Sequence, residues 1–306
     1  MILQKIKRKI YKLFHPAVGE ILMLHRVVEN RSLLDANRQM EITPEFLEKT
    51  LQNYQRKGYQ FVSLDEVHKI VSKQMRPNQK FVCFTLDDGY VDNYELAYPI
   101  FKKYNCPFAI YITTDFPDGK ALLWWYVLED ILINQNELIL GDGTRYDCST
   151  IEKKNTTFDA VRQKIFNSQS QDMGFTLSCM FVNYSYSFED KNERFALNWE
   201  QISEMSKDSL CTIGSHTVSH GVLPNMNVEQ IEAELRDSKL KLEQYVSKKV
   251  DHFAYPYGAF DESVLDFVRR ADYKTAVLAN GAEIRKGNFL WKMSRCIQSN
   301  WNNILN

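Results

Sequence analysis

The 306-residue chain has 44% hydrophobic and 25% charged residues, a well-mixed composition that excludes a disordered or fibrous protein. Its 38 Lys and Arg are balanced by 39 Asp and Glu, which gives a formal net charge of −1. The chain therefore lacks the basic excess that binding to a phosphate backbone needs, and we expect no nucleic-acid partner. Nothing in the composition predicts an oligomeric state.

The chain begins with a basic amphipathic segment, residues 1–19. Its first fourteen residues, MILQKIKRKIYKLF, carry five basic and no acidic side chains, with apolar residues at helical spacing. The apolar run is too short for a secretion signal, and six cysteines without a C-x-x-C pair are typical of reduced thiols. We expect a cytoplasmic protein in which residues 1–14 either contact the inner face of the membrane or pack on the domain.

Residues 20–306 predict one α/β domain, because short β-like runs alternate with helical patterns. The expected strands cover residues 20–27, 60–64, 80–86, 107–113, 210–214, 252–256, 273–279 and 289–295. The expected helices cover residues 44–58, a segment starting near Leu64, and residues 92–105, 199–206, 228–245 and 261–271. This alternation predicts a mainly parallel sheet covered by helices.

Residues 116–196 interrupt the alternation and are predicted to be an insertion in this domain. The segment is polar, rich in Asn, Gln, Ser and Thr, with a helical pattern LLWWYVLEDILI near its start. Within it, the aromatic run Trp124-Trp125-Tyr126 favours core packing, with stacking on sugar rings as the alternative. An insertion of this size also has the length to cover a cleft and select what enters it.

Polar side chains follow several of the expected strands. In barrel enzymes the catalytic groups lie where strands end and loops begin. The candidates at such positions are His25, Asp87, Asp88, His216, Tyr257 and Arg295.

His216 and His220 have the spacing H-x-x-x-H. On a helix this spacing places both imidazoles on one face, where they can share a metal ion. A carboxylate as third ligand leaves positions open for water, which is typical of a catalytic site. The alternative is a pair of histidines on a helix surface.

Asp87-Asp88-Gly89 ends a fully apolar strand. Adjacent carboxylates there repel each other and lose solvation unless a cation offsets them. Gly89 allows a turn that brings both side chains to one cavity, so one carboxylate is expected to bind the ion and the other to act as a base. The alternative is a β-turn with an N-capping Asp.

Three motifs together carry a family resemblance. F-T-L-D-D-G-Y at 84–90, S-H-T-V-S-H at 215–220 and F-A-Y-P-Y-G at 253–258 resemble, in this order, the first three motifs of the polysaccharide deacetylases, carbohydrate esterase family four. The resemblance spans roughly residues 20–115 and 197–298. It implies a deformed (β/α)7-type barrel that removes acetyl groups from N-acetylated sugars with a divalent metal ion, usually zinc.

The resemblance also implies roles for individual residues. By motif position, Asp88, His216 and His220 are the metal ligands and Asp87 is the general base. The backbone N–H of Tyr257 is implied to stabilise the oxyanion.

Two departures from the family pattern concern the general acid and the partner of Asp87. Ala254 stands where the family has an arginine that pairs with the catalytic aspartate, and we expect Arg295 to supply that charge. No histidine follows His252, although the last family motif usually carries a histidine acid.

L-M-L-H-R-V at 22–27 resembles an early strand end of the subgroup with the F-A-Y-P-Y-G motif, with Leu24 in place of a tyrosine. This makes His25 the candidate acid. A core histidine bonded to a backbone carbonyl is the alternative.

Together these features predict a metal-dependent deacetylase acting on an N-acetylated sugar, either a polysaccharide or its precursor. An O-acetyl esterase would use the same groups, and a catalytically silent carbohydrate-binding or assembly protein would explain the two departures. A metal-dependent phosphoesterase is disfavoured, because the sequence has no Gly-rich phosphate loop.

Overall fold

The computed structural model describes residues 16–168, 172–285 and 289–297. The predicted membrane-contact segment, residues 1–14, lies outside the described residues. Among the helices that are described, none combines the length and the apolar character that crossing a bilayer would need.

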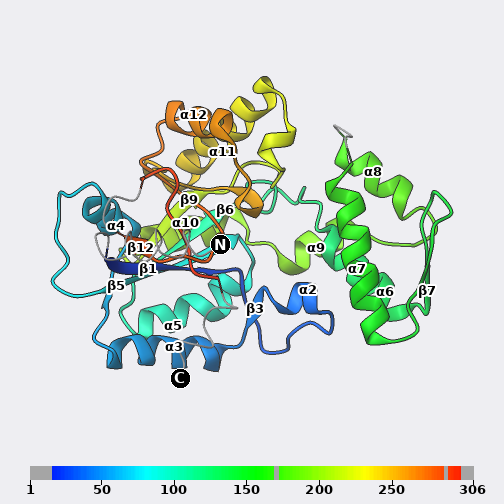
Figure 1. The fold of residues 1–306 in the computed structure, drawn as a ribbon, viewed down its shortest axis with the longest axis horizontal. Coiled ribbons are helices and arrows are strands. Elements are labelled where there is room, and N and C mark those ends of the chain that lie inside the picture. The colour runs from blue at the N-terminus through cyan, green and yellow to red at the C-terminus, as the bar shows by residue number, and fades with distance from the viewer. Residues whose placement is uncertain (1–15, 169–171, 286–288, 298–306) are drawn as a thin grey trace, which may run out of the picture.

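The centre of the molecule is a curled, mainly parallel sheet (Figure 1). Its strand order is β11-β10-β9-β6-β5-β1-β12, with β4 also paired to β5. All of these pairs are parallel except β1 with β12, which is antiparallel. The strands are β1 (Ala17–Leu24), β4 (Gln60–Phe61), β5 (Phe81–Asp88), β6 (Phe108–Ile112), β9 (Cys211–Ser215), β10 (His252–Ala254), β11 (Thr275–Val277) and β12 (Ile284–Arg285).

The last described segment connects β11, at one end of this sheet, to β1, which lies next to the other end. Cys296 N donates to Ile21 O of β1 at 2.7 Å, and Leu278 N, just after β11, donates to Met293 O at 2.8 Å. Met293 and Cys296 form only isolated bridges, so the expected strand at 289–295 is an irregular segment. It nevertheless connects β11 to β1, and the predicted α/β barrel-type fold is confirmed.

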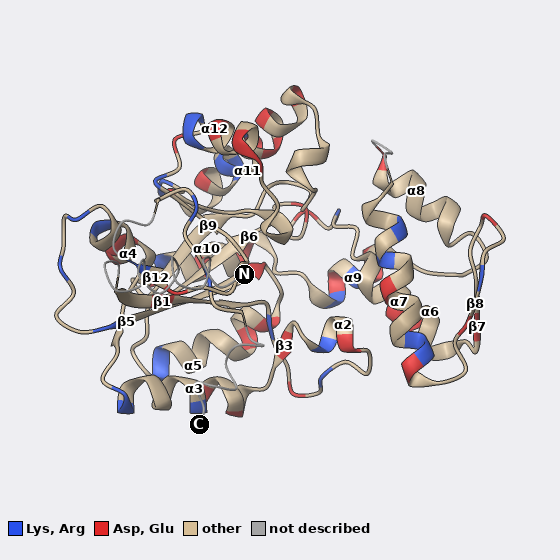
Figure 2. Cartoon of the chain, in the orientation of Figure 1, with Lys and Arg blue, Asp and Glu red and all other residues tan. Residues whose placement is uncertain are grey.

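Helices cover the outside of the sheet, with α3 and α5 on one side and α11 and α12 on the other (Figure 1). Charged residues lie mostly on these helices and the loops, while the strands are largely uncharged (Figure 2). Every residue of β5 is buried, as a strand covered on both faces requires. The helices are α3 (Pro44–Arg56), α4 (Leu64–Val71), α5 (Tyr98–Lys103), α10 (Trp199–Lys207), α11 (Val228–Val246) and α12 (Glu262–Arg270), with a π-helical turn at Asn93–Ala97 before α5.

One expected strand is much shorter in the structure. The run 60–64 was predicted as a strand, but β4 ends at Phe61. Ser63 accepts a hydrogen bond from Glu66 N, and the Glu66 side chain accepts one from Ser63 N. This capping box starts α4 and removes Ser63 from the strand.

Residues 116–196 include a separate group of helices beside the barrel (Figure 1). These helices have their own apolar core, which includes Leu128, Phe158 and Phe181. The elements are α6 (Trp124–Asn134), β7 (Glu137–Ile139), β8 (Arg145–Asp147), α7 (Ile151–Phe166), α8 (Met173–Met180) and α9 (Phe188–Phe195). A bridge between Tyr90, just after β5, and Ala196 brings this group to the edge where the strands end.

Candidate active site

The candidate site lies where two strands of the sheet end. Asp87 and Asp88 are the last residues of β5, and His216 directly follows β9. Both strands pair with β6, in a register that aligns Asp88 with Ile112 and Ile112 with Ser215. Because parallel strands end at the same edge of a sheet, this register brings the carboxylates and the imidazole together across β6.

Asp88, His216 and His220 converge on one point. Oδ1 of Asp88 lies 3.5 Å from Nε2 of His216 and 3.2 Å from Nε2 of His220, and the three ligand atoms all lie within 4.8 Å of one another. Asp88 Oδ1 is buried and has no hydrogen-bond partner among the described residues. One carboxylate oxygen and two imidazole nitrogens in this arrangement fit a divalent cation.

The surroundings favour the protonation states that bind a metal. Burial lowers the pKa of His216 to about 4, so its imidazole is neutral at neutral pH. His216 Nδ1 lies 2.7 Å from Ala254 O, and donating a proton there leaves the Nε2 lone pair free. For Asp88, burial opposes ionisation, but the neighbouring His220 outweighs it and holds the carboxyl pKa below its ordinary value.

The segment that carries the two histidines is not helical, although the H-x-x-x-H spacing was interpreted for the case of a helix. Residues 216–220 form a loop and not a helix, and Thr217 and His220 adopt left-handed φ values of 70° and 60°. The loop is hydrogen-bonded to the chain just beyond β6, through Thr114 N to Thr217 O, Asp115 N to Val218 O and Thr113 Oγ1 to His216 O. These tertiary bonds replace the intrahelical ones, so the histidines meet through a turn and not along a helix face.

Asp87 is held by the candidate partner Arg295. Arg295 Nη1 and Nη2 donate to the two carboxylate oxygens at 2.6 and 2.7 Å. The guanidinium also donates to Thr85 Oγ1 and Leu278 O, and the whole side chain is inaccessible to solvent. Burial alone would raise the pKa of Asp87, but Arg295 overcomes this and lowers it. Arg295 thus supplies the positive charge beside Asp87 that Ala254, in place of the family's usual arginine, cannot supply.

His25 follows β1 and is half-buried. His25 is among the neighbours that lower the pKa values of Asp87 and Asp88. Its backbone carbonyl accepts a hydrogen bond from Asn93 Nδ2 at 2.8 Å. The position is compatible with a proton donor to the site, and the assignment of His25 as the acid stays a prediction.

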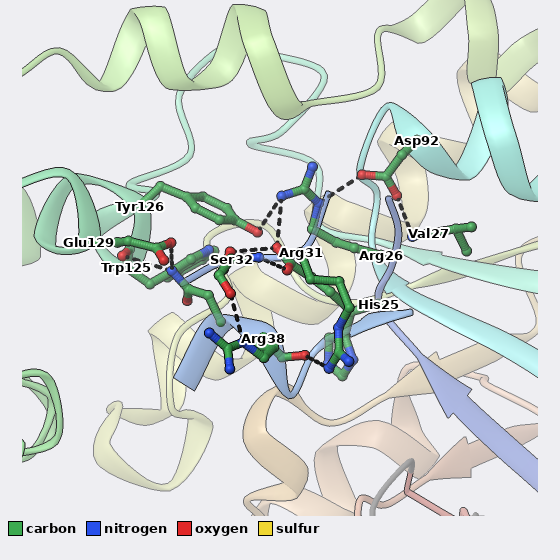
Figure 3. A network of polar contacts seen from close by, with 12 residues as sticks. His25, Arg26, Val27, Arg31, Ser32, Arg38, Asp92, Trp125, Tyr126 and Glu129 are labelled. Carbon is green, nitrogen blue, oxygen red and sulfur yellow. Dashed lines mark hydrogen bonds and ion pairs between the residues drawn. The ribbon is translucent and has the colours of Figure 1, made fainter. Parts of the chain in front are cut away.

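Arg26, which the sequence analysis did not single out, organises a buried network next to His25 (Figure 3). Arg26 donates to Asp92 at 2.7 Å and to Tyr126 Oη at 2.9 Å. Asp92 also accepts from Val27 N at 2.9 Å. An arginine inside the expected apolar strand 20–27 is an unusual sequence feature and was the available signal. The network joins the end of β1 to α6 of the insertion.

Tyr257 lies beside His220. Its backbone is left-handed, with φ 57° and ψ 7°, in the short turn Pro256–Gly258. The centroid of its ring is 4.6 Å from that of His220 and 4.9 Å from that of Phe166, at the end of α7. Its proposed role as a backbone donor to the oxyanion stays a prediction.

The family model described as polysaccharide deacetylase matches residues 168–276. The resemblance to the polysaccharide deacetylase family is therefore confirmed. The matched segment contains His216, His220 and Tyr257. Membership of the subgroup with the F-A-Y-P-Y-G motif stays a prediction.

Named relatives agree with this finding. The Bacillus subtilis (strain 168) protein "Putative polysaccharide deacetylase YxkH" is 21% identical over 280 residues, which cover 92% of this chain and 71% of that protein. The Streptococcus pyogenes deacetylase PplD, solved in complex with acetate, has a TM-score of 0.62 and 21% identity and covers 90% of both chains. IcaB from Ammonifex degensii has a TM-score of 0.62 and 17% identity, covering 94% of this chain and 96% of its own. The two structures show that the fold is shared.

We predict that Arg295→Met destabilises the fold strongly at neutral pH. Removing one partner of a buried ion pair costs about 3–5 kcal/mol, because the other charge stays buried. The lowered pKa of Asp87 means that the pair stabilises the fold above the unfolded pKa of ~3.9, and that this contribution is lost as the pH falls through the folded pKa. Without Arg295, burial raises the pKa of Asp87, so the carboxyl of the variant takes up a proton as the pH falls from 7 to 4 and no longer buries an unpaired charge. The cost of the substitution should therefore be smaller at pH 4 than at pH 7.

Denaturant unfolding of wild type, Arg295→Met, Asp87→Asn and the double variant at pH 7 and pH 4 measures this effect. The double variant should lose less stability than the sum of the two single losses. A cost below about 1 kcal/mol at pH 7, or two strictly additive losses, would show that the pair does not stabilise the fold.

Proposed function

We propose that the protein is a metal-dependent hydrolase that removes an acetyl group from an N-acetylated sugar of a polysaccharide or its precursor. The observation that carries the proposal is that Asp88, His216 and His220 converge on one buried point. The adjacent residue Asp87 is hydrogen-bonded to Arg295. The confirmed family resemblance supports hydrolysis of acetylated polysaccharide in general. The metal, the amide bond and the precursor are the parts that this proposal adds.

Asp88, His216 and His220 would hold the metal, with zinc as the expected ion for one carboxylate and two imidazoles. A bound divalent ion supplies polarisation of the acetyl carbonyl and acidification of a water. The orphaned Oδ1 of Asp88 fits this group, because a buried anionic oxygen without a donor is costly unless a cation meets it.

Asp87 is placed to take the proton of the attacking water. Its two oxygens are fixed by Arg295 at 2.6 and 2.7 Å, so the carboxylate is oriented before substrate arrives. The lowered pKa keeps it ionised at neutral pH and therefore able to accept a proton, and it also makes Asp87 a weaker base than an ordinary aspartate. Arg295 touches Asp87 and not the substrate, and so acts as a positioning residue.

Two further groups complete the proposed chemistry. The backbone N–H of Tyr257 would stabilise the developing oxyanion, where one donor is typically worth about 2.7–4 kcal/mol. His25 would donate a proton to the departing amine, because an amide nitrogen is a poor leaving group until it is protonated.

An amide is favoured over an ester as the substrate, although both share the oxyanion. One solved neighbour, a de-N-acetylase from Aggregatibacter actinomycetemcomitans, has a TM-score of 0.59 and 17% identity, covering 94% of this chain and 99% of its own. Release of acetate from N-acetylated sugars, compared with O-acetylated ones, separates the two activities. Metal binding without any release of acetate would favour a silent carbohydrate-binding protein.

We predict that Asp87 and the three ligands have separable roles. Asp87→Asn should keep its metal and lose turnover at least about 100-fold, since the base is gone. Asp88→Ala, His216→Ala and His220→Ala should each lower the amount of bound metal.

Metal analysis of each purified variant, combined with an acetate-release assay, tests these roles. Full activity in Asp87→Asn would overturn the base assignment. Wild-type metal content in Asp88→Ala would overturn the ligand set.

We predict that the effect of His25→Ala depends on the leaving group. The rate on an N-acetylated sugar should fall about 100-fold or more, because the amine needs a proton to depart. The loss should be much smaller on 4-nitrophenyl acetate, whose phenolate leaves without protonation. Acetate release from both substrates by wild type and variant measures this contrast, and equal losses on the two substrates would remove His25 from the role of acid.

A further inference from the structure

The insertion reaches the candidate metal site through a closed set of aromatic contacts. The ring centroid of His220 lies 6.1 Å from that of Trp125 and 4.6 Å from that of Tyr257. Phe166 then contacts Tyr257 at 4.9 Å, and Trp124 contacts both Phe166 and Trp125, at 6.1 and 5.6 Å. Three of the five rings, those of Trp124, Trp125 and Phe166, belong to the insertion.

The five rings differ in burial: a buried ring can only support its neighbours, whereas an exposed ring can also contact a ligand. Trp124 is only 6% exposed and packs in the apolar core of the insertion. Trp125 and Phe166 are half-buried, and Tyr257 is 43% exposed. Large aromatic surface therefore remains accessible immediately beside a candidate metal ligand.

The backbone of Trp125 is hydrogen-bonded to the short helix α2 (Asp35–Arg38), which packs beside the insertion. The backbone carbonyl of Trp125 accepts a hydrogen bond from Asn37 Nδ2 at 3.3 Å, and the same amide group donates to Glu129 of α6 at 2.6 Å. The next residue of α6, Tyr126, is bonded to Arg26 at the end of β1. Binding surfaces on elements held in this way are pre-organised.

We propose that Trp125 and Tyr257 form one wall of the substrate site, against which the ring of the acetylated pyranose packs. The ligand class is an N-acetylated hexosamine unit, and this inference rests on the proposed function. A pyranose presents apolar C–H faces between polar edges, and an accessible aromatic face pairs with such a surface while the acetyl group reaches the metal side. Phe166 contacts the ring of Tyr257, so residues of the insertion contribute to both parts of the wall, and the insertion is proposed to select the substrate.

The test compares Trp125→Ala with Trp125→Phe and with the control Phe175→Ala, a change at a 65% exposed aromatic residue of the same insertion. KM and kcat are measured on an N-acetylated oligosaccharide and on 4-nitrophenyl acetate, with metal content determined for each variant. Trp125→Ala should raise KM for the oligosaccharide about ten-fold or more, with a clearly smaller effect on the aryl acetate. Trp125→Phe should recover part of the loss, and Phe175→Ala should match wild type.

Equal losses on both substrates, or a loss of metal in Trp125→Ala, would overturn the wall and make Trp125 a support of His220. An unchanged KM would overturn it as well. If wild type releases no acetate from any sugar, the proposed function fails. The affinity of wild type and of Trp125→Ala for the oligosaccharide, measured by titration, then still tests the proposed wall. Weaker binding by the variant supports the wall, and equal binding overturns it.

A second, independent observation concerns Glu234 of α11. Its carboxylate accepts three hydrogen bonds from the loop between the two histidines, from Val218 N at 2.7 Å and from Ser219 N and Oγ at 3.0 and 2.6 Å. The same loop has left-handed backbone at Thr217 and His220. Such conformations at residues other than glycine persist only where surrounding contacts hold them.

We infer that Glu234 is a positioning residue that holds His220 in its metal-binding position. Glu234→Ala should weaken zinc binding about 10–100-fold, as loss of a residue that orients a ligand typically does. Glu234→Gln keeps a side-chain oxygen that can accept from the loop and should recover part of the affinity. Glu232→Ala, on the same helix and without contact to this loop, is the control.

Zinc affinity is measured by competition with a chromophoric chelator, and the visible spectrum of the cobalt-substituted protein reports ligand geometry. A folded Glu234→Ala protein with wild-type affinity and spectrum would overturn the inference. If that variant does not fold, Glu234→Gln decides: weakened binding with an altered spectrum supports the role, and wild-type values for both overturn it. Absence of zinc binding in wild type would contradict the proposed function itself.

Discussion

Two adjacent carboxylates buried at the end of one strand are the constraint on which this site depends. Asp87 and Asp88 are only 2% and 4% exposed, and neither charge can be kept there without compensation. Arg295 compensates Asp87 through two hydrogen bonds, from a position 208 residues away in the sequence. Asp88 faces two histidines and keeps one oxygen without a donor. The neighbouring aspartates are therefore in different environments and suited to different roles.

The barrel provides this arrangement through register. Because β5 and β9 flank β6, Asp88 and His216 are brought together by backbone pairing before any side-chain contact is considered. The loop after β9 is hydrogen-bonded to the residues that follow β6. These bonds bring His220 back toward Asp88. The irregular segment at Met293 and Cys296 connects β11 to β1 and carries Arg295 into the core. A segment without regular strand structure is thus essential to the site.

The sequence was sufficient to predict much of this site. The alternation of strands and helices, the motif residues and the expected partner of Asp87 were all visible, because strand-end motifs and an isolated buried charge are local signals. The histidines do not share a helix face, which was the geometry considered for the H-x-x-x-H spacing, because tertiary hydrogen bonds with Thr113, Thr114 and Asp115 hold this segment as a loop.

Arg26 was missed for a related reason. Its partners Asp92 and Tyr126 lie 66 and 100 residues away, and no local pattern connects them to it. Contacts between an insertion and the domain that carries it depend on packing, which spacing and periodicity do not report. The same limit applies to the proposed Trp125 wall, because the sequence pattern favoured core packing for this aromatic run.

The most direct test of this account is a crystal structure of the protein with zinc, in which anomalous scattering locates the ion. The account predicts an anomalous peak about 2.0–2.2 Å from a carboxylate oxygen of Asp88 and from Nε2 of both His216 and His220. It also predicts that Asp87 stays hydrogen-bonded to Arg295 and does not bind the ion. A peak at another place, or an ion bound by Asp87 with Arg295 displaced, would contradict it.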